Sequence, residues 1–289
     1  MTTFRIRPGI LAGTWYPNDR IELRQSIEVM LARAELQFGS RRRDPNRLQA
    51  LILPHAGHRY SGKTCAMGVC AARGGRFSKI FLLGPSHRAP VSGAVLSDAT
   101  HFETPLGAIP VDLDTVRQLQ AAGLPVSGTV HAREHSLEII LPFLQIAFPQ
   151  STIVPILIGS LTETACADLA GRIKPCIGDR SLVIASSDFV HYGADFNYLP
   201  PVGPDVRAGV RKIDEGAVDC IRRIRGADLL AYQRSTGATI CGILPIAVLL
   251  DIFSAGSAEV ELLDYSQSAD VSDDTDHMVS YAAIALYRI

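Results

Sequence analysis

Three apolar, β-favouring runs of the chain each end in a short motif that contains a histidine. These motifs are Leu53-Pro54-His55-Ala56-Gly57, Gly84-Pro85-Ser86-His87 and Ser186-Ser187-Asp188-Phe189-Val190-His191. In open α/β sheets the ligand crevice lies beyond the carboxyl ends of the strands, so side chains that follow separate strands converge there. The repetition therefore predicts one cleft that contains His55, His87, Asp188 and His191.

The residue types in this predicted cleft favour a metal. Neutral imidazole and carboxylate groups bind first-row transition metals, and a metal with open positions is a usual place for oxygen or redox chemistry. Asp188 and His191 stand three residues apart, so both face one point if Phe189 begins a helical turn. The alternative is that Asp188 caps a helix and that the backbone satisfies His191.

The alternation of helical and strand patterns indicates an α/β fold. The expected helices are 20–38, 61–73 with Ser61 as its cap, 134–148, 162–174, 205–223, 226–234 and 241–253, and the expected strands are 48–54, 79–83, 152–158, 181–185, 259–265 and 278–287. Right-handed crossovers place strands 48–54 and 79–83 in one parallel sheet. Residues 93–112 indicate a hairpin or edge excursion, and the last two strands are expected to pair at a sheet edge. We expect a single domain over residues 1–289, with a mostly parallel or mixed central sheet flanked by helices.

Composition excludes several classes of partner. The formal net charge is -1, so no general field attracts nucleic acid or an anionic membrane. The basic run Arg41-Arg42-Arg43 lies between Gly-Ser and Asp-Pro pairs, which is typical of a solvated loop. The start of the chain has no signal-peptide pattern, and no window approaches the roughly 20 apolar residues of a membrane span. We therefore expect a cytoplasmic protein whose partner is a small molecule or a peptide.

Residues 134–148 carry an apolar stripe and an internal proline, Pro142, which is expected to kink the helix. Glu134 and His135 stand at its start, where the helix dipole favours a carboxylate, so Glu134 is either a site residue or a cap partner. Glu138, one turn on, is expected to hold a loop or a ligand histidine by a hydrogen bond.

Cys241 stands at the expected start of the last helix, whose dipole would lower the pKa of the thiol and favour a metal-binding thiolate. The alternative is an inert, buried cysteine. His58 and Tyr60 follow His55 closely and are expected to line the cleft beside it. A serine hydrolase is the main rival, because Ser86, Ser186 and Ser187 neighbour histidines, but the chain has no G-x-S-x-G nucleophile elbow.

Seven motifs together resemble the Memo family over nearly the whole chain. They are Gly13-Thr14-Trp15-Tyr16-Pro17, Pro54-His55-Ala56-Gly57, Tyr60-Ser61-Gly62, Gly84-Pro85-Ser86-His87, Glu134-His135-Ser136-Leu137-Glu138, the segment from Ser186 to Gly193, and Val279-Ser280-Tyr281-Ala282. The resemblance extends to the bacterial and archaeal Memo-like proteins known as AmmeMemoRadiSam system protein B. It implies a fold similar to that of class III extradiol ring-cleaving dioxygenases.

The resemblance also implies a metal site. In the family, the histidines of the PHAG and GPSH motifs and a late cysteine bind iron or copper, and these match His55, His87 and Cys241; zinc is an alternative. Asp188 and His191 are implied to share the cleft, and Trp15 is implied to form part of its rim. His58 stands where many relatives carry tyrosine or phenylalanine.

Two functions follow from this site. The first is a metal-dependent oxidoreductase, in which His191 or His135 carries a proton, Asp188 orients it and Glu134 takes part. A thiolate in place of the dioxygenase carboxylate favours copper or a redox role. The second is a non-enzymatic protein that binds a peptide or handles metal in the same cleft. Only Arg59 and Arg88 stand beside the motifs, which weakens a phosphate-reading function.

Overall fold

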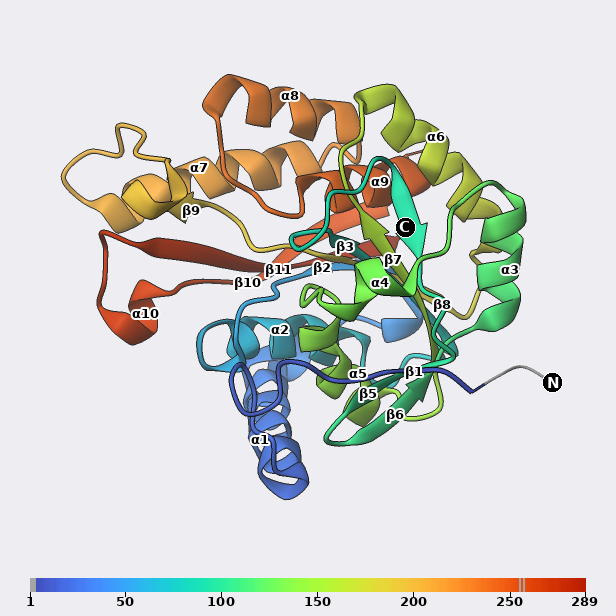
Figure 1. Cartoon of the computed structure of the whole chain (residues 1–289). Helices are drawn as coiled ribbons and strands as arrows, with labels where there is room; N and C mark the ends of the chain where they lie inside the picture. Colours follow the sequence, from blue (N-terminus) through green and yellow to red (C-terminus); the bar gives the residue numbers. More distant parts are fainter. Residues whose placement is uncertain (1–3, 255, 257) are drawn as a thin grey trace.

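The computed structural model describes residues 4–254, 256 and 258–289 and has a mixed α/β architecture around a central sheet (Figure 1). The sheet has the strand order β10-β11-β2-β8-β3-β7-β4, and β9 pairs with β11 outside this path. Its strands are β2 (Leu48–Leu53), β3 (Lys79–Pro85), β4 (Ala94–Leu96), β7 (Thr152–Ile158), β8 (Ser181–Ser186), β9 (His191–Tyr192), β10 (Ala258–Gln267) and β11 (Met278–Arg288). The expectation of a mixed sheet flanked by helices is confirmed.

The middle of the sheet is parallel. β2 pairs with β8, β8 with β3, and β3 with β7, all in parallel, whereas β4 and β11 run antiparallel to their neighbours. Leu53 is opposite Ser186, and Ala185 is opposite Leu83. The carboxyl ends of β2, β8 and β3 therefore meet at one edge, as the sequence predicts.

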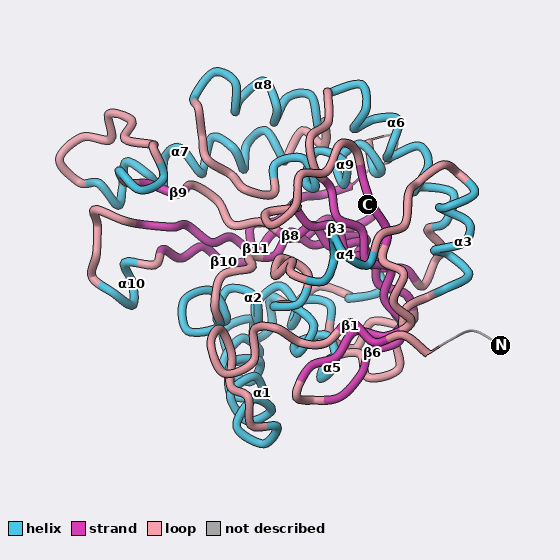
Figure 2. The backbone as a smooth tube through the Cα atoms, viewed as in Figure 1, coloured by secondary structure: helices cyan, strands magenta, loops and turns pink. Residues whose placement is uncertain are grey.

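Helices cover both faces of this sheet (Figures 1 and 2). One face carries α1 (Arg20–Phe38), α2 (His58–Ala72) and α5 (Leu141–Ala147), and the other carries α6 (Glu163–Ile173), α7 (Val206–Ile221), α8 (Gly226–Thr236) and α9 (Ile243–Phe253). The Asp19 side chain caps α1 by accepting hydrogen bonds from the N–H groups of Ile21 and Glu22. Residues at helical spacing form the buried stripe of α1: Leu23, Ile27, Leu31, Ala34 and Phe38.

Smaller elements surround this core. Residues 93–112 form β4 at the sheet edge and a hairpin of β5 (His101–Thr104) and β6 (Gly107–Pro110), which pairs with β1 (Ile6–Arg7) in a second sheet. The short helices α3 (Leu113–Ala121), α4 (Gly128–Ala132) and α10 (Ala269–Ser272) lie in connections. β10 and β11 pair antiparallel, as expected, with β10 at the edge and β11 beside β2.

The second helix begins earlier than predicted. α2 starts at His58 and Gly57 is its N-cap, so Ser61 is not the cap. The Ser61 hydroxyl instead donates to the carbonyl of Ala56 (2.8 Å). This placement puts His58 and Tyr60 in the first helical turn rather than in a loop.

The predicted helix over 134–148 is wrong over its first four residues and is confirmed as an α-helix only over Leu141–Ala147. Residues 134–137 are not helical, a 3-10 turn covers Glu138–Ile140, and α5 begins only at Leu141. Pro142 lies in the first turn of α5, where no helical N–H bond is required, so it does not kink the helix. This 3-10 turn and the first four residues of α5 are buried, and the last three residues of α5 are half-buried.

Phe189 does not begin a helical turn. Its N–H donates to the carbonyl of Ser280 (2.8 Å), and the N–H of Ser280 donates to the carbonyl of Val190 (2.9 Å). The segment from Asp188 to Tyr192 therefore runs beside β11 and ends in β9. Asp188 is also not a helix cap, because no helix follows it.

None of the helices in the described part of the chain has the length and apolar character needed to cross a membrane. Residues 1–3, on which part of the expected absence of a targeting segment rests, lie outside the described residues.

We predict that Gly68→Ala destabilises the protein by about 1–3 kcal/mol, because overpacking a core forces its neighbours to move. A Cβ on Gly68 of α2 would lie 2.2 Å from Cδ2 of the buried Leu53 of β2. The helical Gly171 of α6 has no atom within 4 Å of such a Cβ. Gly171→Ala is the matched control and should stabilise by up to about 1 kcal/mol. Denaturant midpoints of the two variants check this, and equal midpoints would contradict the close packing of α2 on β2.

Candidate metal centre

Three site residues follow three neighbouring strands at the same distance. His55, His87 and Asp188 each stand two residues beyond the last residue of β2, β3 and β8. His135 joins them from the connection before α5, and Cys241 from the residue before Gly242, the N-cap of α9. The ring centroids of His55 and His87 are 5.1 Å apart, and that of His135 lies 5.5 Å from His55 and 4.5 Å from His87.

These side chains form two overlapping groups of metal-ligand atoms. His55, His87 and His135 make up one group, and His55, Asp188 and Cys241 make up the other, with ligand atoms within 4.8 Å of one another in each. His55 belongs to both groups. Neither group contains both His87 and Cys241, so the three ligands implied by the family resemblance are divided between them.

The hydrogen bonds of His55 fix its tautomer. The single hydroxyl proton of Ser186 is donated to the carbonyl of Ser136 (2.5 Å), so Oγ of Ser186 accepts from Nδ1–H of His55 (2.8 Å). Nε2 of His55 is then unprotonated, and it lies 3.1 Å from Sγ of Cys241. Burial, with the nearby imidazoles of His87 and His135, holds the pKa of His55 well below its usual value. A neutral ring with a free Nε2 is what a metal requires.

Glu134 holds His87 in the same tautomer. Its Oε1 lies 3.0 Å from Nδ1 of His87, and its Oε2 accepts the N–H of His87 (2.6 Å). Oε1 also accepts the N–H groups of His135 and Ser136 (both 3.0 Å). Burial raises the pKa of Glu134, but the hydrogen bonds from His87 and Ser136 outweigh it and leave that pKa lowered. The ionised carboxylate accepts the Nδ1 proton of His87, so Nε2 of His87 is free.

One ring nitrogen of His135 is buried without a hydrogen-bond partner among the described residues. Its Nδ1 is buried, lies 3.2 Å from Oε1 of Glu134 without hydrogen-bond geometry, and has no partner among the described residues. Its ring stacks on His87 at an interplanar angle of 26°, and its centroid lies 4.8 Å from that of Trp15. Burial lowers the pKa of His135 to about 4, so the ring is neutral at pH 7.

Asp188 is bound to His55 and Cys241 rather than to His191. Its Oδ1 accepts the N–H of His55 (2.7 Å), its Oδ2 lies 4.0 Å from Nε2 of His55, and its own N–H donates to Sγ of Cys241 (3.2 Å). Burial raises the pKa of Asp188 to about 6, although the charge of His191 and the backbone N–H groups of His55 and Ala56 oppose this.

The expected lowering of the Cys241 pKa is wrong. Burial, followed by the charge of Asp188, raises the pKa of the thiol, because the desolvation of a thiolate exceeds what the backbone donors supply. Without a metal the group is a thiol, and a metal has to displace its proton. Gly242 lets this segment approach β8, since a Cβ there would lie 2.3 Å from the carbonyl oxygen of Ser186.

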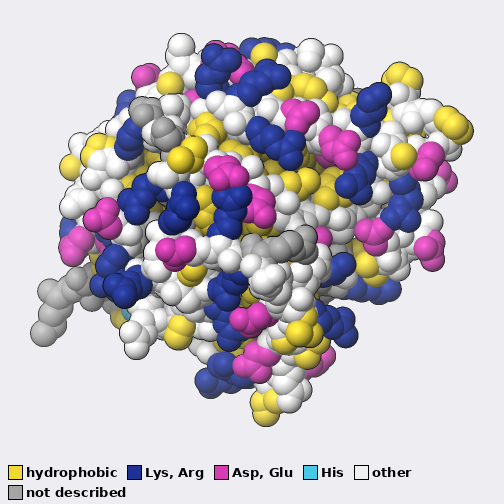
Figure 3. Space-filling view, turned by 180° about the vertical axis from the view of Figure 1, so that it is seen from behind, with side chains coloured by type: hydrophobic (Ala, Val, Ile, Leu, Met, Phe, Trp, Pro, Cys, Tyr) yellow, Lys and Arg dark blue, Asp and Glu magenta, His cyan; other side chains and the backbone are white. Residues whose placement is uncertain are grey.

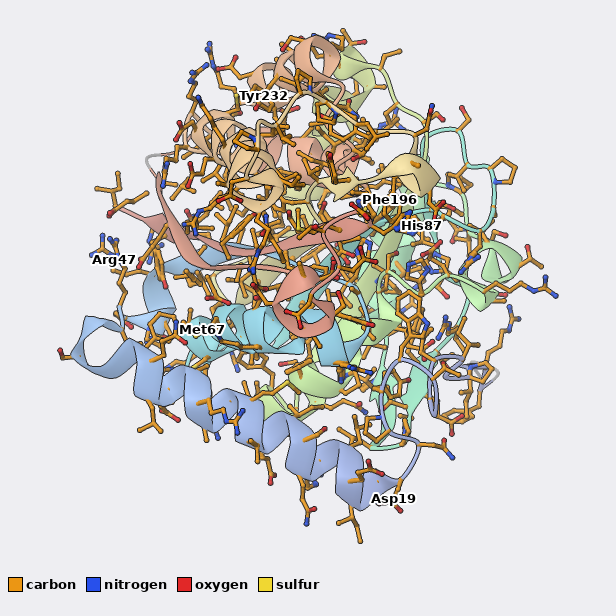
Figure 4. All side chains as sticks on the ribbon, turned by 90° about the vertical axis from the view of Figure 1, so that its left-hand side faces the viewer. Asp19, Arg47, Met67, His87, Phe196 and Tyr232 are labelled. Atoms are coloured by element: carbon orange, nitrogen blue, oxygen red, sulfur yellow. The ribbon has the colours of Figure 1, made fainter. Side chains whose placement is uncertain are left out.

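His191 stands beside the two groups and belongs to neither. Its Nδ1 lies 2.9 Å from the carbonyl of Phe189 and 3.0 Å from that of Thr239, so Nδ1 carries the proton and Nε2 is free. Its ring contacts Phe196 at a centroid distance of 5.1 Å, and Figure 4 shows Phe196 and His87 on the same side of the molecule. The residue before His191 is also held, because the N–H of Val190 donates to the carboxylate of the buried Asp214 (3.0 Å).

Trp15, His58 and Tyr60 were expected to contact substrate. Only Trp15 contacts one of the two ligand groups, through the ring of His135. Nε2 of His58 hydrogen-bonds to the carbonyl of Ile139 (2.9 Å), and its ring packs on Tyr16 and Phe143. Tyr60 lies on the surface of α2 with 37% of its area exposed. His58 is therefore part of the packing between α2 and α5, and neither it nor Tyr60 belongs to the two groups.

A buried ion pair that the sequence did not reveal positions this site. Glu138 pairs with Arg7 and accepts the N–H groups of Ile10 and Leu11 (both 2.9 Å) and the hydroxyl of Tyr16 (2.6 Å). Arg7 also donates to the carbonyls of His131 (3.2 Å) and Glu134 (2.5 Å). The expectation that Glu138 holds a loop is confirmed, and the loop is the one that carries Trp15.

Sequence reasoning also missed the polar groups that fix the imidazoles. Ser186, Ser136 and Thr239 orient His55 and His191. The position of Ser186 in the Ser-Ser-Asp motif could have indicated its role, but the sequence analysis considered this serine only as a nucleophile. Its proton is committed to the carbonyl of Ser136, so the hydroxyl serves as an acceptor for the histidine.

The fold and the site define an α/β protein with histidine and cysteine donors at the carboxyl edge of a mixed sheet. The chain belongs to the family described as Memo-like protein, whose pattern it matches over residues 7–285. Protein MEMO1 of Homo sapiens is 30% identical over 289 residues, which are 95% of this chain and 95% of that protein. A MEMO1 family protein of Thermotoga neapolitana is 31% identical over 97% of this chain and 99% of its own.

A solved structure supports the fold alone. The crystal structure of an uncharacterized protein of Escherichia coli K12 superposes with a TM-score of 0.51 and 12% sequence identity, covering 83% of this chain and 99% of that chain.

We predict that Glu138→Gln destabilises the protein by about 3 kcal/mol or more, because it leaves a buried arginine uncompensated. Trp15 is the only tryptophan, so its fluorescence reports directly on the loop that Glu138 holds. We expect its emission to shift to the red in the variant. Glu28→Gln, which breaks an exposed pair with Arg24, is the control and should cost less than about 0.5 kcal/mol. An unchanged emission spectrum in Glu138→Gln would contradict the proposed role of the pair.

Proposed function

We propose that this Memo-family protein binds iron or copper in its cleft and acts as an oxidoreductase on a small organic substrate. The observation that carries the proposal is the common tautomer of His55, His87 and His191. Each has its Nδ1 proton committed to a fixed acceptor, so each presents a free Nε2. Fixed tautomers of this kind are typical of metal-ligating histidines.

The donor set fits a first-row transition metal. His55, His87 and Cys241 are the proposed ligands, with Asp188 and His135 next to them. The buried Nδ1 of His135 without a partner supports the fit, because polar atoms left unsatisfied in a core commonly mark a group that is bound there. Imidazole suits iron, copper and zinc, and the sulfur favours copper.

The metal, when bound, would supply Lewis acidity and electron transfer to substrate or oxygen. Side chains of the protein would supply proton transfer, the positioning of the ligands and the exclusion of water. His191 is the proposed proton carrier at its free Nε2, because the carbonyls of Phe189 and Thr239 hold its other nitrogen. Glu134 positions His87 and His135 and is not itself a proton donor, since its pKa is lowered. Trp15 covers His135 and limits the access of water.

We predict that the protein loaded anaerobically with Fe(II) or Cu(I) retains about one ion per chain, and that His55→Ala combined with His87→Ala removes it. Cys241→Ser should weaken binding roughly tenfold or more, because it replaces a soft ligand. Elemental analysis after desalting measures retention, and quenching of Trp15 fluorescence measures affinity.

The controls are a histidine and a cysteine outside the site. His101→Ala and Cys176→Ser, a half-buried cysteine like Cys241, should leave both readouts unchanged. If His135→Asn abolishes binding and Cys241→Ser has no effect, the ion is held by the three histidines and the proposed ligand set is wrong. Full retention in the double histidine variant would refute the metal site.

We predict that the loaded protein consumes oxygen when a catechol is added, and that His191→Asn slows this roughly 100-fold or more while metal content is unchanged. An oxygen electrode and loss of catechol absorbance measure the reaction, with the double histidine variant as the blank. A fully loaded site without turnover on any catechol would contradict the oxidoreductase and favour a peptide-binding or metal-handling protein.

A further inference from the structure

A hollow of about 740 Å³ lies at the opposite edge of the central sheet from the candidate metal centre. It is lined by the first residues of β2 and β8, Leu48 and Ser181, by the loops before β3 and β8, and by Arg288 at the end of the antiparallel β11. Figure 4 shows this separation, since Arg47, beside Leu48, and His87 lie on opposite sides of the molecule. The hollow is therefore independent of the cleft described above.

Among the described residues, three arginines and one carboxylate, Asp179, line this hollow. Arg76, Arg180 and Arg288 are all exposed, and within the described ranges none of them forms an ion pair. Arg47, whose Nε donates to the carbonyl of Arg288 (2.9 Å), is also without an ion pair there. In Figure 3, which views this side, basic side chains are spread across the surface with apolar surface between them.

Other arginines at the same end of the molecule lie beside carboxylates. Arg43 pairs with Glu259 (2.5 Å) and Glu261 (2.9 Å), and Arg42 and Arg73 each lie 3.4 Å from Glu35. Arg76, Arg180 and Arg288 thus differ from these neighbouring arginines, in a chain whose net charge is -1. Unbalanced guanidinium groups that face one hollow favour an anion.

Two features make the hollow more than a basic surface. Nε of Arg180 donates to the carbonyl of Arg76 (3.1 Å), which places one guanidinium and leaves its terminal nitrogens available. The lining also contains the polar residues Asn46 and Gln49 and four apolar side chains, which we call the apolar floor: Leu48, Phe77, Ile177 and Phe253. An apolar floor with a few convergent polar groups is the usual composition of a small-molecule site.

We propose that this hollow is a second ligand site, which binds a small amphipathic anion: one phosphate, sulfonate or carboxylate group on a flat apolar body. The arginines bind the anionic group, and the apolar floor covers the body. The site requires no metal and makes no contact with His55, His87 or Cys241.

Naphthalene-2-sulfonate is the probe, and isothermal titration calorimetry at low ionic strength is the measurement. We expect saturable binding to the intact chain at one site, and binding of inorganic sulfate or of 2-naphthol roughly tenfold weaker or more, because each supplies only half of the contacts. Arg76→Gln combined with Arg180→Gln should weaken the probe roughly tenfold or more, and Arg288→Gln alone by a smaller factor.

The matched control is Arg20→Gln combined with Arg33→Gln, which removes the same charge from two exposed α1 arginines that have no ion pair in the described part of the chain. It should leave probe affinity within about twofold. His87→Ala should also leave it unchanged, which separates this site from the proposed metal function. Absence of saturable binding, equal losses in the two arginine pairs, or loss of binding in His87→Ala would overturn the proposal.

Discussion

The parallel register of β2, β8 and β3 is the constraint on which the candidate site depends. Leu53 lies opposite Ser186, and Ala185 opposite Leu83, so β2 and β8 end at one level and β3 ends one residue further, at Pro85. His55, Asp188 and His87 each follow two residues later, and this equal spacing brings their side chains to one place. A slip of one residue in any strand would turn its alternate side chains to the other face of the sheet. The placement of the site residues thus depends on the hydrogen bonds between buried parallel strands.

The ion pair of Arg7 and Glu138 positions the segments of the site that do not follow a strand of the central sheet. Glu138 binds the backbone of residues 10 and 11 and the hydroxyl of Tyr16, whereas Arg7 binds carbonyls at 131 and 134. Two irregular segments far apart in sequence are therefore joined by one fully desolvated pair. Such a pair contributes little net stability compared with apolar packing, but removing one partner is costly. Its effect here is to place Trp15 against His135.

The sequence predicts the features of the site that local patterns encode. The strands predicted over 48–54, 79–83 and 181–185 end within two residues of the observed strand ends, so His55, His87 and Asp188 were correctly predicted to follow strands. The first turn of the helix expected over 134–148 does not form, because the Glu134 carboxylate binds the N–H groups of His135 and Ser136, which competes with helix formation. The predicted lowering of the Cys241 pKa was wrong because the pKa is raised by burial, which depends on tertiary packing and cannot be inferred from a position before a helix. The division of the ligands into two groups depends on distances between segments that are far apart in the sequence, and hydrophobic periodicity gives no information about those distances.

The position of His55 in both ligand groups sets a limit on the capacity of the cleft. Ser186 occupies one ring nitrogen of His55, so a single lone pair remains, and one lone pair serves one ion. Two separate ions, one in the all-nitrogen group and one in the group with sulfur and carboxylate, therefore exclude each other, whereas the single ion proposed above takes His87 from the first group and Cys241 from the second. The two groups differ in softness, since His87 and His135 add nitrogen donors to His55 whereas Cys241 and Asp188 add sulfur and oxygen, so the metal that is bound would be set by how many ligands come from each side of the shared imidazole.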